Sequence, residues 1–395
     1  KLEPKVPVPP VINIILLLNI CLLFIFDKIR CTYIVFFYKI NIQTHSMVSI
    51  CDLNKTSKEI YITFEIGPTH TGFESCIDYC KKVKKSGANA IKIQMMDADR
   101  LMANKKQIFE YKILSKNKKI IYKKESLYKI LKRRELTKKQ IEKIKFFCDK
   151  INLEFISTAF FEEDVDFLKN LGCNSIKVAS ADINYEKLLI KAAKSKLNIQ
   201  LDTGMSTLEE IKKSISILKK HNNKNFLIHH CPSGYPANVE KINLNMINEI
   251  KSRFGCPVGF SDHSPDWEMS VAAVALGANL IEKTITFNRC YPSVEHIMSI
   301  ELNKLHDFVR KINFTKKALG KTNLKLTLDE IKNRNNLRRS PYFIRNERKG
   351  TKIKDCKLDF KRPGLGIDPR DIKNIKNKKL LRNVKKDQIL NKKLI

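Results

Sequence analysis

From residue 59 onward, short apolar segments alternate with longer stretches in which apolar residues recur roughly every three to four positions. The short segments are typical of buried parallel strands, and the longer stretches are typical of amphipathic helices. We expect eight strands, at residues 60–66, 89–94, 154–158, 174–180, 198–203, 225–230, 257–262 and 279–285. Eight strand–helix units within about 250 residues predict an α/β protein with a closed (β/α)₈ TIM barrel.

Local signals mark where several of the helices begin and end. Thr137 and Gln140 have the T-x-x-Q spacing of a capping box, and Ser206 with Glu209 repeats this spacing before another helical stretch. Glycines that suit a left-handed helix end follow three of the predicted helices: Gly87, Gly172 and Gly277.

The pattern divides the chain into four parts. Residues 59–320 are the predicted barrel, and residues 100–135 form a Lys-rich, weakly helical insertion that we expect to cover the barrel mouth. A charged linker follows at residues 321–336. Residues 337–395 contain short β-like runs, SPYFI and KLDF, and a turn-rich segment, so they predict a separate small β-rich module.

The N-terminal part, residues 1–58, does not follow the barrel pattern. Its apolar run at residues 11–26 is compatible with a signal segment or a short membrane anchor. The first methionine of the chain is Met47. We therefore expect residues 1–46 to be an upstream extension, and we expect no membrane association unless residues 11–26 form a real anchor.

Composition changes this picture only slightly. The formal net charge is +34, but the lysines are spread through every helical stretch, and no basic motif with interleaved aromatic residues is present. We therefore expect no nucleic-acid partner. The eleven cysteines contain no C-x-x-C pair. This pattern favours reduced, buried thiols in a cytoplasmic protein.

Polar side chains gather at the carboxyl ends of the predicted strands, where TIM barrels carry their chemistry. Lys92 and Lys177 lie inside strands that are otherwise built of apolar residues. A charge in such a layer must be compensated, either by an acidic neighbour or by an anionic ligand. We expect an anionic ligand that carries both a phosphate and a carboxylate.

His263 is the best candidate for a metal ligand. It follows Asp262 at the end of the seventh strand, and we expect further carboxylates around it. Such surroundings suit a hard, partly hydrated cation such as Mn²⁺ or Mg²⁺. The alternative is a structural histidine that is hydrogen-bonded to Asp262 or to the backbone.

Ten segments in a specific order and spacing resemble the sialic acid synthase family, which includes N-acetylneuraminate, legionaminate and pseudaminate synthases. They are EIGPTHTG (65–72), IKIQ (91–94), FIST (155–158), IKVAS (176–180), DTGMSTLEEI (202–211), HCPSGYPA (230–237), GFSDH (259–263), AAVALGANLIEKT (272–284), EHIMS (295–299) and KRPGLGI (361–367). The resemblance covers nearly everything from residue 60 to the end. It implies a TIM barrel followed by an antifreeze-like (SAF) domain that reaches into the barrel of a partner subunit in a domain-swapped homodimer.

The resemblance also implies roles for individual residues. The positions that match the phosphoenolpyruvate site are Lys92, Thr158, Lys177, Ser180, Ser233 and Ser261. Those that match the amino-sugar site are Gln94, Asp182, Tyr235, Glu295 and Arg362, and the last corresponds to an arginine that contacts the N-acetyl group. Glu65 matches a glutamate near the reacting carbons, and His263 matches one of two metal-binding histidines.

The chain departs from the family pattern at several of these positions. Thr284 stands where the second metal-binding histidine is expected, so His296, Glu295 or His70 would have to replace that ligand. Asp202 replaces a serine that helps to bind phosphate, and an aspartate there would repel the phosphate unless it is paired. Asp182 stands where the family commonly has a glutamate, and Glu295 stands where the family has an aspartate. These changes favour a distinct subfamily.

The resemblance implies that the chain condenses phosphoenolpyruvate with an open-chain N-acetylated hexosamine, such as N-acetylmannosamine or a diacetylated analogue, with Mn²⁺ or Mg²⁺ as Lewis acid. The catalytic residues would be Glu65, Lys92, Lys177 and His263. Two alternatives remain open. One is a Schiff-base aldolase that uses Lys177 or Lys92, and the other is a catalytically silent barrel that binds an anionic polymer.

Overall fold

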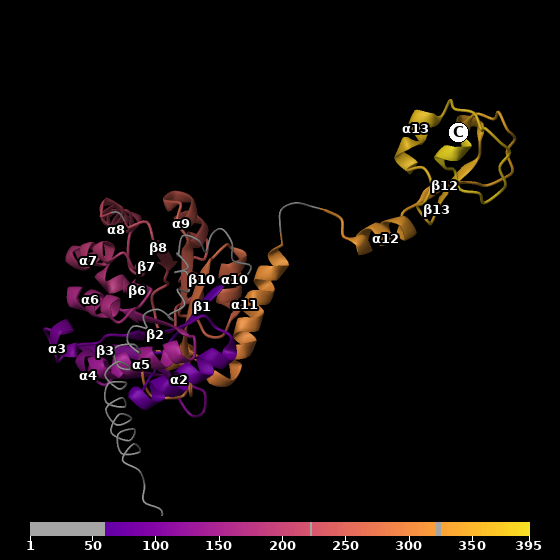
Figure 1. Ribbon diagram of the computed structural model, residues 1–395. Helices are drawn as coiled ribbons and strands as arrows, with labels where there is room; N and C mark the ends of the chain where they lie inside the picture. The colour runs from indigo at the N-terminus through magenta and orange to yellow at the C-terminus, as the bar shows by residue number, and fades with distance from the viewer. Residues whose placement is uncertain (1–59, 222, 321–324) are drawn as a thin grey trace, which may run out of the picture. The chain divides into compact units, whose positions relative to one another are not determined.

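Eight parallel strands close into a barrel in the computed structural model (Figure 1). The structure describes residues 60–221, 223–320 and 325–395. Each predicted barrel strand is confirmed to within two residues at either end, as β1 (Tyr61–Glu65), β2 (Ala90–Gln94), β5 (Glu154–Thr158), β6 (Ser175–Val178), β7 (Asn198–Asp202), β8 (Phe226–His230), β9 (Val258–Asp262) and β10 (Leu280–Thr286). The strands pair in chain order, and β10 pairs back onto β1 to close the barrel. The (β/α)₈ prediction is therefore confirmed.

Helices surround the barrel and bury the outward-facing side of each strand. The helices are α2 (Phe73–Ser86), α5 (Lys138–Lys150), α6 (Glu162–Asn170), α7 (Glu186–Ser195), α8 (Leu208–Lys220), α9 (Met246–Phe254), α10 (Glu268–Ala275) and α11 (Leu305–Leu319). Between strands and helices lies a continuous apolar core that includes Phe64, Ile91, Phe155 and Phe260. A short strand, β11 (Ile300–Glu301), extends the sheet beside β10. Because side chains alternate along a strand, the polar residues between these apolar positions point into the barrel.

The predicted helix signals are confirmed with one exception. Thr137 and Gln140 form the predicted capping box of α5. The three predicted glycines end their helices with positive φ angles. The second capping box was predicted one residue too early, because Thr207 and Glu210, and not Ser206 and Glu209, cap α8. Two adjacent hydroxyl residues each have an acid three positions later, so the spacing alone did not distinguish them.

The insertion after β2 was predicted to be weakly helical, and this prediction was wrong for its central part. The insertion contains α3 (Ala98–Leu101), an antiparallel hairpin of β3 (Ile108–Leu114) and β4 (Ile120–Ser126), and α4 (Leu127–Lys132). Aromatic and β-branched residues in alternation favour strands, and here they outweighed the many lysines. Tyr111 and Ile113 of the hairpin pack against Ile130, Val294 and Tyr235. The hairpin therefore covers the loops that follow β8 and β10, as expected of a segment over the barrel mouth.

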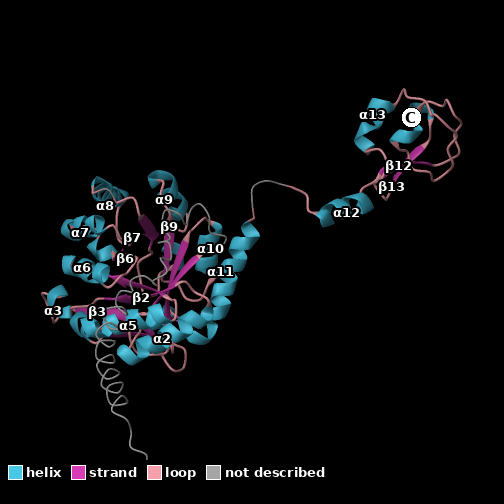
Figure 2. Cartoon of the chain, viewed as in Figure 1, coloured by secondary structure: helices cyan, strands magenta, loops and turns pink. Residues whose placement is uncertain are grey.

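A second compact unit begins at Gly320. It contains α12 (Leu328–Leu337), the antiparallel pair β12 (Ser340–Phe343) and β13 (Leu358–Lys361), and α13 (Ile372–Ile375) (Figure 2). Its own apolar core includes Phe343, Leu380 and Leu390. The two predicted β-like runs are confirmed as strands, and the predicted linker contains the helix α12.

Among the described residues, no helix is both long enough and apolar enough to cross a bilayer. The apolar run at residues 11–26 lies outside the described residues.

Candidate active site

Five charged side chains form a connected network across the inside of the barrel. Glu282 of β10 lies at its centre, with Oε1 2.6 Å from Nζ of Lys177 and 3.3 Å from Nζ of Lys92. Lys92 also contacts Glu65, and Lys177 lies 2.9 Å from Asp202. All five residues are at most 8% exposed. We refer to this set as the lumen network.

The parallel register explains why these side chains meet. Glu65 of β1 pairs with Lys92 on one side and with Thr284 on the other. Glu282 therefore points into the barrel two positions before Thr284, on the same face of β10. Lys177 reaches the same level from the other side of the barrel. Inward-facing residues of neighbouring strands form shared layers in this fold, and one of these layers is charged here.

The charges of the network set the protonation of its acids. Burial works to raise the pKa of Glu282, but Lys177 and Lys92 together outweigh it and hold this pKa well below its ordinary value. Burial raises the pKa of Glu65 and of Asp202 above their ordinary values, against the attraction of the neighbouring lysines. Glu282 is therefore the permanent counter-charge, whereas Glu65 and Asp202 are the groups that can take up a proton.

We expected an anionic ligand to compensate Lys92 and Lys177, and the structure corrects this expectation. Carboxylates of the chain itself already pair with both ammonium groups. The same contacts resolve the position of Asp202, which is paired with Lys177 and so does not present an isolated negative charge. An anion that binds to these lysines must therefore displace the carboxylates, or it must bind when the acids Glu65 and Asp202 are protonated.

Three polar residues support the network from within the barrel. The hydroxyl of Ser261, a predicted site residue, donates to Oε1 of Glu282 at 3.0 Å. Gln200 and His229 are joined by a side-chain hydrogen bond of 3.0 Å one strand away. Burial holds the pKa of His229 well below its ordinary value, so the imidazole is neutral. Gly259 allows this arrangement, because a Cβ there would lie 2.7 Å from Nδ1 of His229.

A cavity of about 430 Å³ lies at the carboxyl ends of the strands. It brings together four of the predicted site residues: Ser180, Ser233, Tyr235 and His263. The hairpin of the insertion forms part of its wall through Phe109, Glu110, Tyr111, Lys112 and Tyr122.

Cys231 connects this cavity to the lumen network. It lines the cavity, and its thiol is in hydrogen-bond contact with Ser261. The loops converge closely at this point, because a Cβ at Gly204 would lie 2.9 Å from the carbonyl oxygen of Cys231 and 3.1 Å from Oγ of Ser180. The serine hydroxyls of the cavity therefore lie above the buried charges.

The remaining predicted residues of strands β2 and β5 lie beside the network. Thr158 is buried and pairs in register with Gln94 on one side and with Lys177 on the other. The side chain of Gln94 and Oε1 of Glu65 crowd Gly67, where a Cβ would lie 2.5 Å from each. The backbone amide of Gly67 donates to the Glu65 carboxylate at 2.5 Å, which fixes the orientation of this acid.

A second group of titratable side chains lies near the mouth, around Glu295. Burial raises the pKa of Glu295 to about 7, although the Arg134 guanidinium acts against this shift. His70 and His296 are both buried, and burial together with Arg134 lowers the pKa of His70 to about 4 and that of His296 to about 3. We refer to Arg134, Glu295, His70 and His296 as the mouth cluster. Asp182 follows β6 separately, and burial raises its pKa to about 6.

His263 has the chemistry of a metal ligand but lacks partners for that role. Burial lowers its pKa to about 4, so the imidazole is neutral, and Nδ1 bonds to the carbonyl oxygen of Pro232 at 3.1 Å. His263 also lines the cavity. The backbone contact is the one expected of a structural histidine, whereas Asp262 is not a partner of His263, because it pairs with Lys283 and accepts from Ser264 and Ser270. This pair lies on the helix-facing side of the strands.

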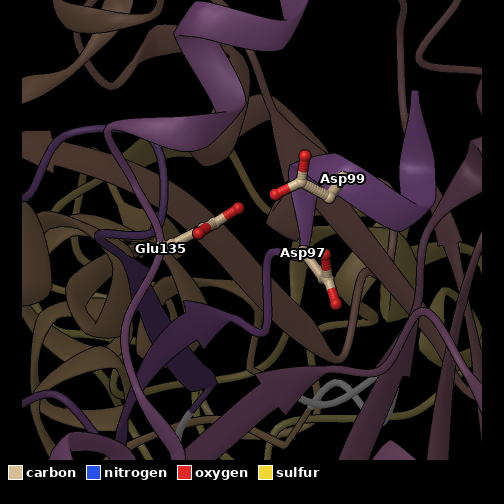
Figure 3. A group of neighbouring side chains, drawn as sticks. All are labelled: Asp97, Asp99 and Glu135. Carbon is tan, nitrogen blue, oxygen red and sulfur yellow. The ribbon is translucent and has the colours of Figure 1, made fainter. Parts of the chain in front are cut away.

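The other candidate, His296, bonds through Nδ1 to Thr286 at 2.7 Å. Within the described ranges, neither His263 nor His296 belongs to a group of three potential ligands whose donor atoms lie within 4.8 Å of one another. Such a group does occur at Asp97, Asp99 and Glu135 in the insertion (Figure 3). Lys105 and Lys132 already pair with Asp99, and Lys132 also pairs with Glu135. This acidic group is therefore neutralised by the chain itself.

Arg362 belongs to the second unit, where it precedes a cis proline after β13. The barrel unit alone therefore does not contain this predicted contact to the amino sugar.

Sequence reasoning did not assign a role to Glu282, His229 or Arg134, and it treated Asp202 only as a departure from the family pattern. One signal for Glu282 was available. Two lysines inside apolar strands require counter-charges, and Glu282 shares the inward face of its strand with Thr284. No comparable signal pointed to Arg134, because it lies in a Lys- and Arg-rich turn of the insertion.

Comparisons with known proteins show the family to which the chain belongs. The model of the NeuB family matches residues 79–324. An N,N'-diacetyllegionaminic acid synthase of Legionella pneumophila is 30% identical over 334 residues, which cover 83% of this chain and 92% of that protein. A pseudaminic acid synthase of Campylobacter jejuni is 31% identical over 332 residues, which cover 84% of this chain and 95% of that protein.

Among solved structures, the N-acetylneuraminic acid (sialic acid) synthetase of Leptospira borgpetersenii, in complex with citrate, superposes with a TM-score of 0.61 at 30% identity. The match covers 71% of this chain and 92% of that chain.

Proposed function

The chain belongs to the NeuB family of nonulosonic acid synthases, and we propose that it condenses phosphoenolpyruvate with an N-acetylated hexosamine to give a nonulosonic acid and phosphate. The observation that carries this proposal is that two buried ammonium groups lie inside a barrel whose strand ends carry a cavity lined by Ser180 and Ser233. This arrangement provides both positive charge and hydrogen-bond donors for a small substrate that bears a phosphate and a carboxylate.

The phosphoenolpyruvate site would use Lys92, Lys177 and the hydroxyl groups around them. Ser180 and Ser233 line the cavity, and Ser261 and Thr158 lie at the level of the lysines. The acids of the network need not prevent binding. Glu65 and Asp202 have raised pKa values, so they can hold a proton while the lysines neutralise the substrate.

The acceptor site would lie at the mouth, between the hairpin and the loops that carry Tyr235, Asp182 and Glu295. Tyr235 stacks obliquely on His263, with ring centroids 5.1 Å apart, and forms one wall of the cavity. Gln94 completes the set on the side of Glu65. Arg362 would be supplied by a second copy of the chain, which is why we propose a homodimer as the working form in the cytoplasm.

In the proposed reaction, C3 of phosphoenolpyruvate attacks the aldehyde carbon of the open-chain sugar and forms the new carbon–carbon bond. The aldehyde oxygen takes up a proton. Water then adds to C2 of the resulting oxocarbenium and loses a proton, which balances the proton taken up by the aldehyde oxygen. The bond between C2 and the phosphate oxygen then breaks and leaves a keto group and phosphate. Glu65 is our candidate for moving the proton near C3, because it is oriented by Gly67 and has a raised pKa. Fixed charges and positioning would provide most of the acceleration.

A divalent cation, Mn²⁺ or Mg²⁺, would polarise the aldehyde of the sugar if it were bound beside His263. His263 offers one neutral imidazole, and Thr284 stands where a second histidine would be needed. Protein sites for such ions usually provide several ligands. The described side chains around His263 therefore provide too few ligands to hold such an ion by themselves.

The decisive experiment is a coupled assay of phosphate release from phosphoenolpyruvate with a panel of N-acetylated and diacetylated hexosamines, with and without Mn²⁺ or Mg²⁺. We expect release only when both substrates are present, and mass spectrometry should identify the nine-carbon product. Absence of release with every acceptor would reject the proposed function.

The structure favours the synthase over a Schiff-base aldolase. A nucleophilic lysine needs a lowered pKa. Burial acts in this direction on Lys92, but Glu282, Glu65 and Asp202 together raise its pKa. Lys177 is held by two carboxylates. Treatment with borohydride in the presence of substrates should therefore trap no adduct. The silent polymer-binding barrel predicts instead a salt-sensitive association that Lys92→Ala leaves unchanged.

A further inference from the structure

Arg134 is a buried cation without a counter-ion. It lies in the turn after α4, is 5% exposed, and has a buried Nη2 that meets no hydrogen-bond partner. Among the described residues, no carboxylate oxygen lies within the 4.0 Å of an ion pair with its guanidinium. Removing a charged group from water without a partner is strongly unfavourable, so an orphaned guanidinium needs an explanation.

The adjacent residue shows that the chain can pair an arginine at this turn. Arg133 bonds to Glu125 of β4 at 2.5 and 2.8 Å and to the hydroxyl of Ser293 at 3.0 Å. It holds the hairpin against the loop after β10. Arg134, by contrast, is buried. Its backbone is fixed by a hydrogen bond to Leu131, and Ile130 anchors the end of the helix in the apolar cluster under the hairpin.

The groups that face Arg134 form an incomplete polar pocket. Glu295 and Tyr235 act on the guanidinium from the loops after β10 and β8, and Glu65 acts on it from β1. Nε2 of His70 is also buried and has no hydrogen-bond partner. The carboxylate of Glu295 makes no ion pair within 4.0 Å in the part of the chain that the structure describes. Arg134 and His70 can therefore donate hydrogen bonds, and Glu295 can accept one, but these side chains form no hydrogen bond with one another.

We propose that Arg134 is an acceptor-binding residue, whose Nη2 donates a hydrogen bond to a hydroxyl or acetamido oxygen of the amino sugar, while Glu295 accepts from a neighbouring hydroxyl of the same molecule. This inference rests on the proposed function and names a contact to the acceptor that neither the sequence motifs nor the comparisons assign. The site takes a neutral, hydroxylated ligand, because the carboxylate of Glu295 faces the same space and would repel a phosphate or carboxylate.

The test measures acceptor binding and turnover separately, in the full-length protein. Arg134→Gln is compared with the matched control Lys129→Gln, which removes a positive charge from the solvent-exposed side of the same α4 helix. We expect Arg134→Gln to raise KM for N-acetylmannosamine about tenfold or more, since a hydrogen bond from a charged donor is lost. KM for phosphoenolpyruvate should stay close to that of the wild type, and the melting temperature should not fall, since the variant removes a buried charge without a partner. Lys129→Gln should change none of these.

Isothermal titration with N-acetylmannosamine and with its 6-phosphate separates this inference from the proposed function. If the wild type binds N-acetylmannosamine in an Arg134-dependent manner but releases no phosphate, the function fails and the inference stands. If the wild type is active and Arg134→Gln leaves acceptor binding and KM unchanged, the inference is overturned. If Arg134→Gln loses only the binding of the 6-phosphate, the proposal that Arg134 donates to a hydroxyl or acetamido oxygen is overturned. If Arg134→Gln does not fold, Arg134→Met, which has no hydrogen-bond donor in its side chain, provides the test, and an unchanged acceptor affinity in that variant again overturns the inference.

Discussion

The lumen network and the mouth cluster are both buried, but they satisfy their charges in opposite ways. In the lumen, each lysine contacts two carboxylates, and Glu282 bridges the two lysines. At the mouth, Arg134 and Glu295 influence one another and yet form no ion pair within 4.0 Å. A paired network belongs to the scaffold as much as to the chemistry, whereas unpaired groups at a cavity indicate where a ligand completes the structure.

This difference predicts opposite effects on stability. Removing one partner of a buried ion-paired set leaves an uncompensated charge and destabilises the protein. Removing a buried charge that has no partner relieves a desolvation penalty. Substitutions in the two regions therefore distinguish them even without an assay of activity.

The largest effect is expected for Lys177→Met. Both Glu282 and Asp202 lose a counter-charge, so we expect the free energy of unfolding to fall by about 3–5 kcal/mol. The phosphoenolpyruvate site also loses one of its two cations, so kcat/KM should fall by about a thousandfold or more. Urea unfolding and the phosphate-release assay measure the two effects.

Lys191→Met is the matched control, because Lys191 pairs with Asp166 on the protein surface, 2.6 Å away. A surface pair contributes about 0–1 kcal/mol, so this variant should resemble the wild type in both assays. A fully active and stable Lys177→Met would show that the lumen network contributes neither to the scaffold nor to the chemistry.

Glu295→Gln should have the opposite effect on stability. Burial raises the pKa of Glu295 to about 7 from 4.5, so ionising this acid in the folded protein weakens stability as the pH rises through that interval. Each pKa unit corresponds to about 1.4 kcal/mol, and the amide variant should therefore gain about 3 kcal/mol relative to the wild type at pH 8. At pH 4 the two proteins should be nearly equal.

The measurement is urea unfolding of both proteins across this pH range. The same variant should bind the acceptor more weakly, because the amide offers a poorer acceptor than the carboxylate. A stability difference that does not change with pH would contradict the assignment of Glu295 as an unpaired buried acid.

The barrel could be predicted from the sequence because its signals are local and repeated. Apolar segments of five to seven residues at regular spacing, with glycines after the helices, identify each strand independently of the others. The hairpin of the insertion could not be recognised in the same way. Its lysines dominate the composition, and the alternation that makes it a hairpin is spread over two strands of seven residues each.

The candidate site was predictable in its residues but not in its pairings. Ser180, Ser233, Tyr235 and His263 follow different strands, and the barrel brings them to one cavity, as their places at strand ends indicated. The sequence could not show that Glu282 reaches both lysines, because that contact crosses the barrel between non-neighbouring strands. Nor could it separate Arg134 from its paired neighbour Arg133, since the difference lies in the burial and the partners of each side chain.

The affinity for phosphoenolpyruvate should depend on pH through the lumen network. With Glu65 and Asp202 protonated, the two ammonium groups and Glu282 leave a net charge of +1. With both acids ionised, the net charge is −1. Because burial raises the pKa values of these two acids, the favourable state persists to higher pH than for ordinary carboxyls and is lost as the pH rises through those values.

We therefore expect KM for phosphoenolpyruvate to rise as the pH rises through the raised pKa values of these two acids, because each proton that is lost adds a negative charge beside the lysines. Asp202→Asn should flatten this profile, because it removes one of the two titrating groups. A KM that falls with pH in the wild type would contradict the proposed competition between carboxylates and substrate.

The smallest effect is expected from restoring a second imidazole beside His263. Lys283 pairs in register with Asp262, so Thr284 and His263 are the next residues along two adjacent strands, and their side chains point into the barrel together. Thr284→His should therefore increase the affinity for Mn²⁺ about tenfold, because a second neutral nitrogen ligand is added to the first. Titration of Mn²⁺ followed by electron paramagnetic resonance measures this gain. It should disappear in the double variant His263→Ala/Thr284→His, because the new imidazole then stands alone. A gain that persists without His263 would mean that the added histidine binds elsewhere, and the two positions would not form a shared site.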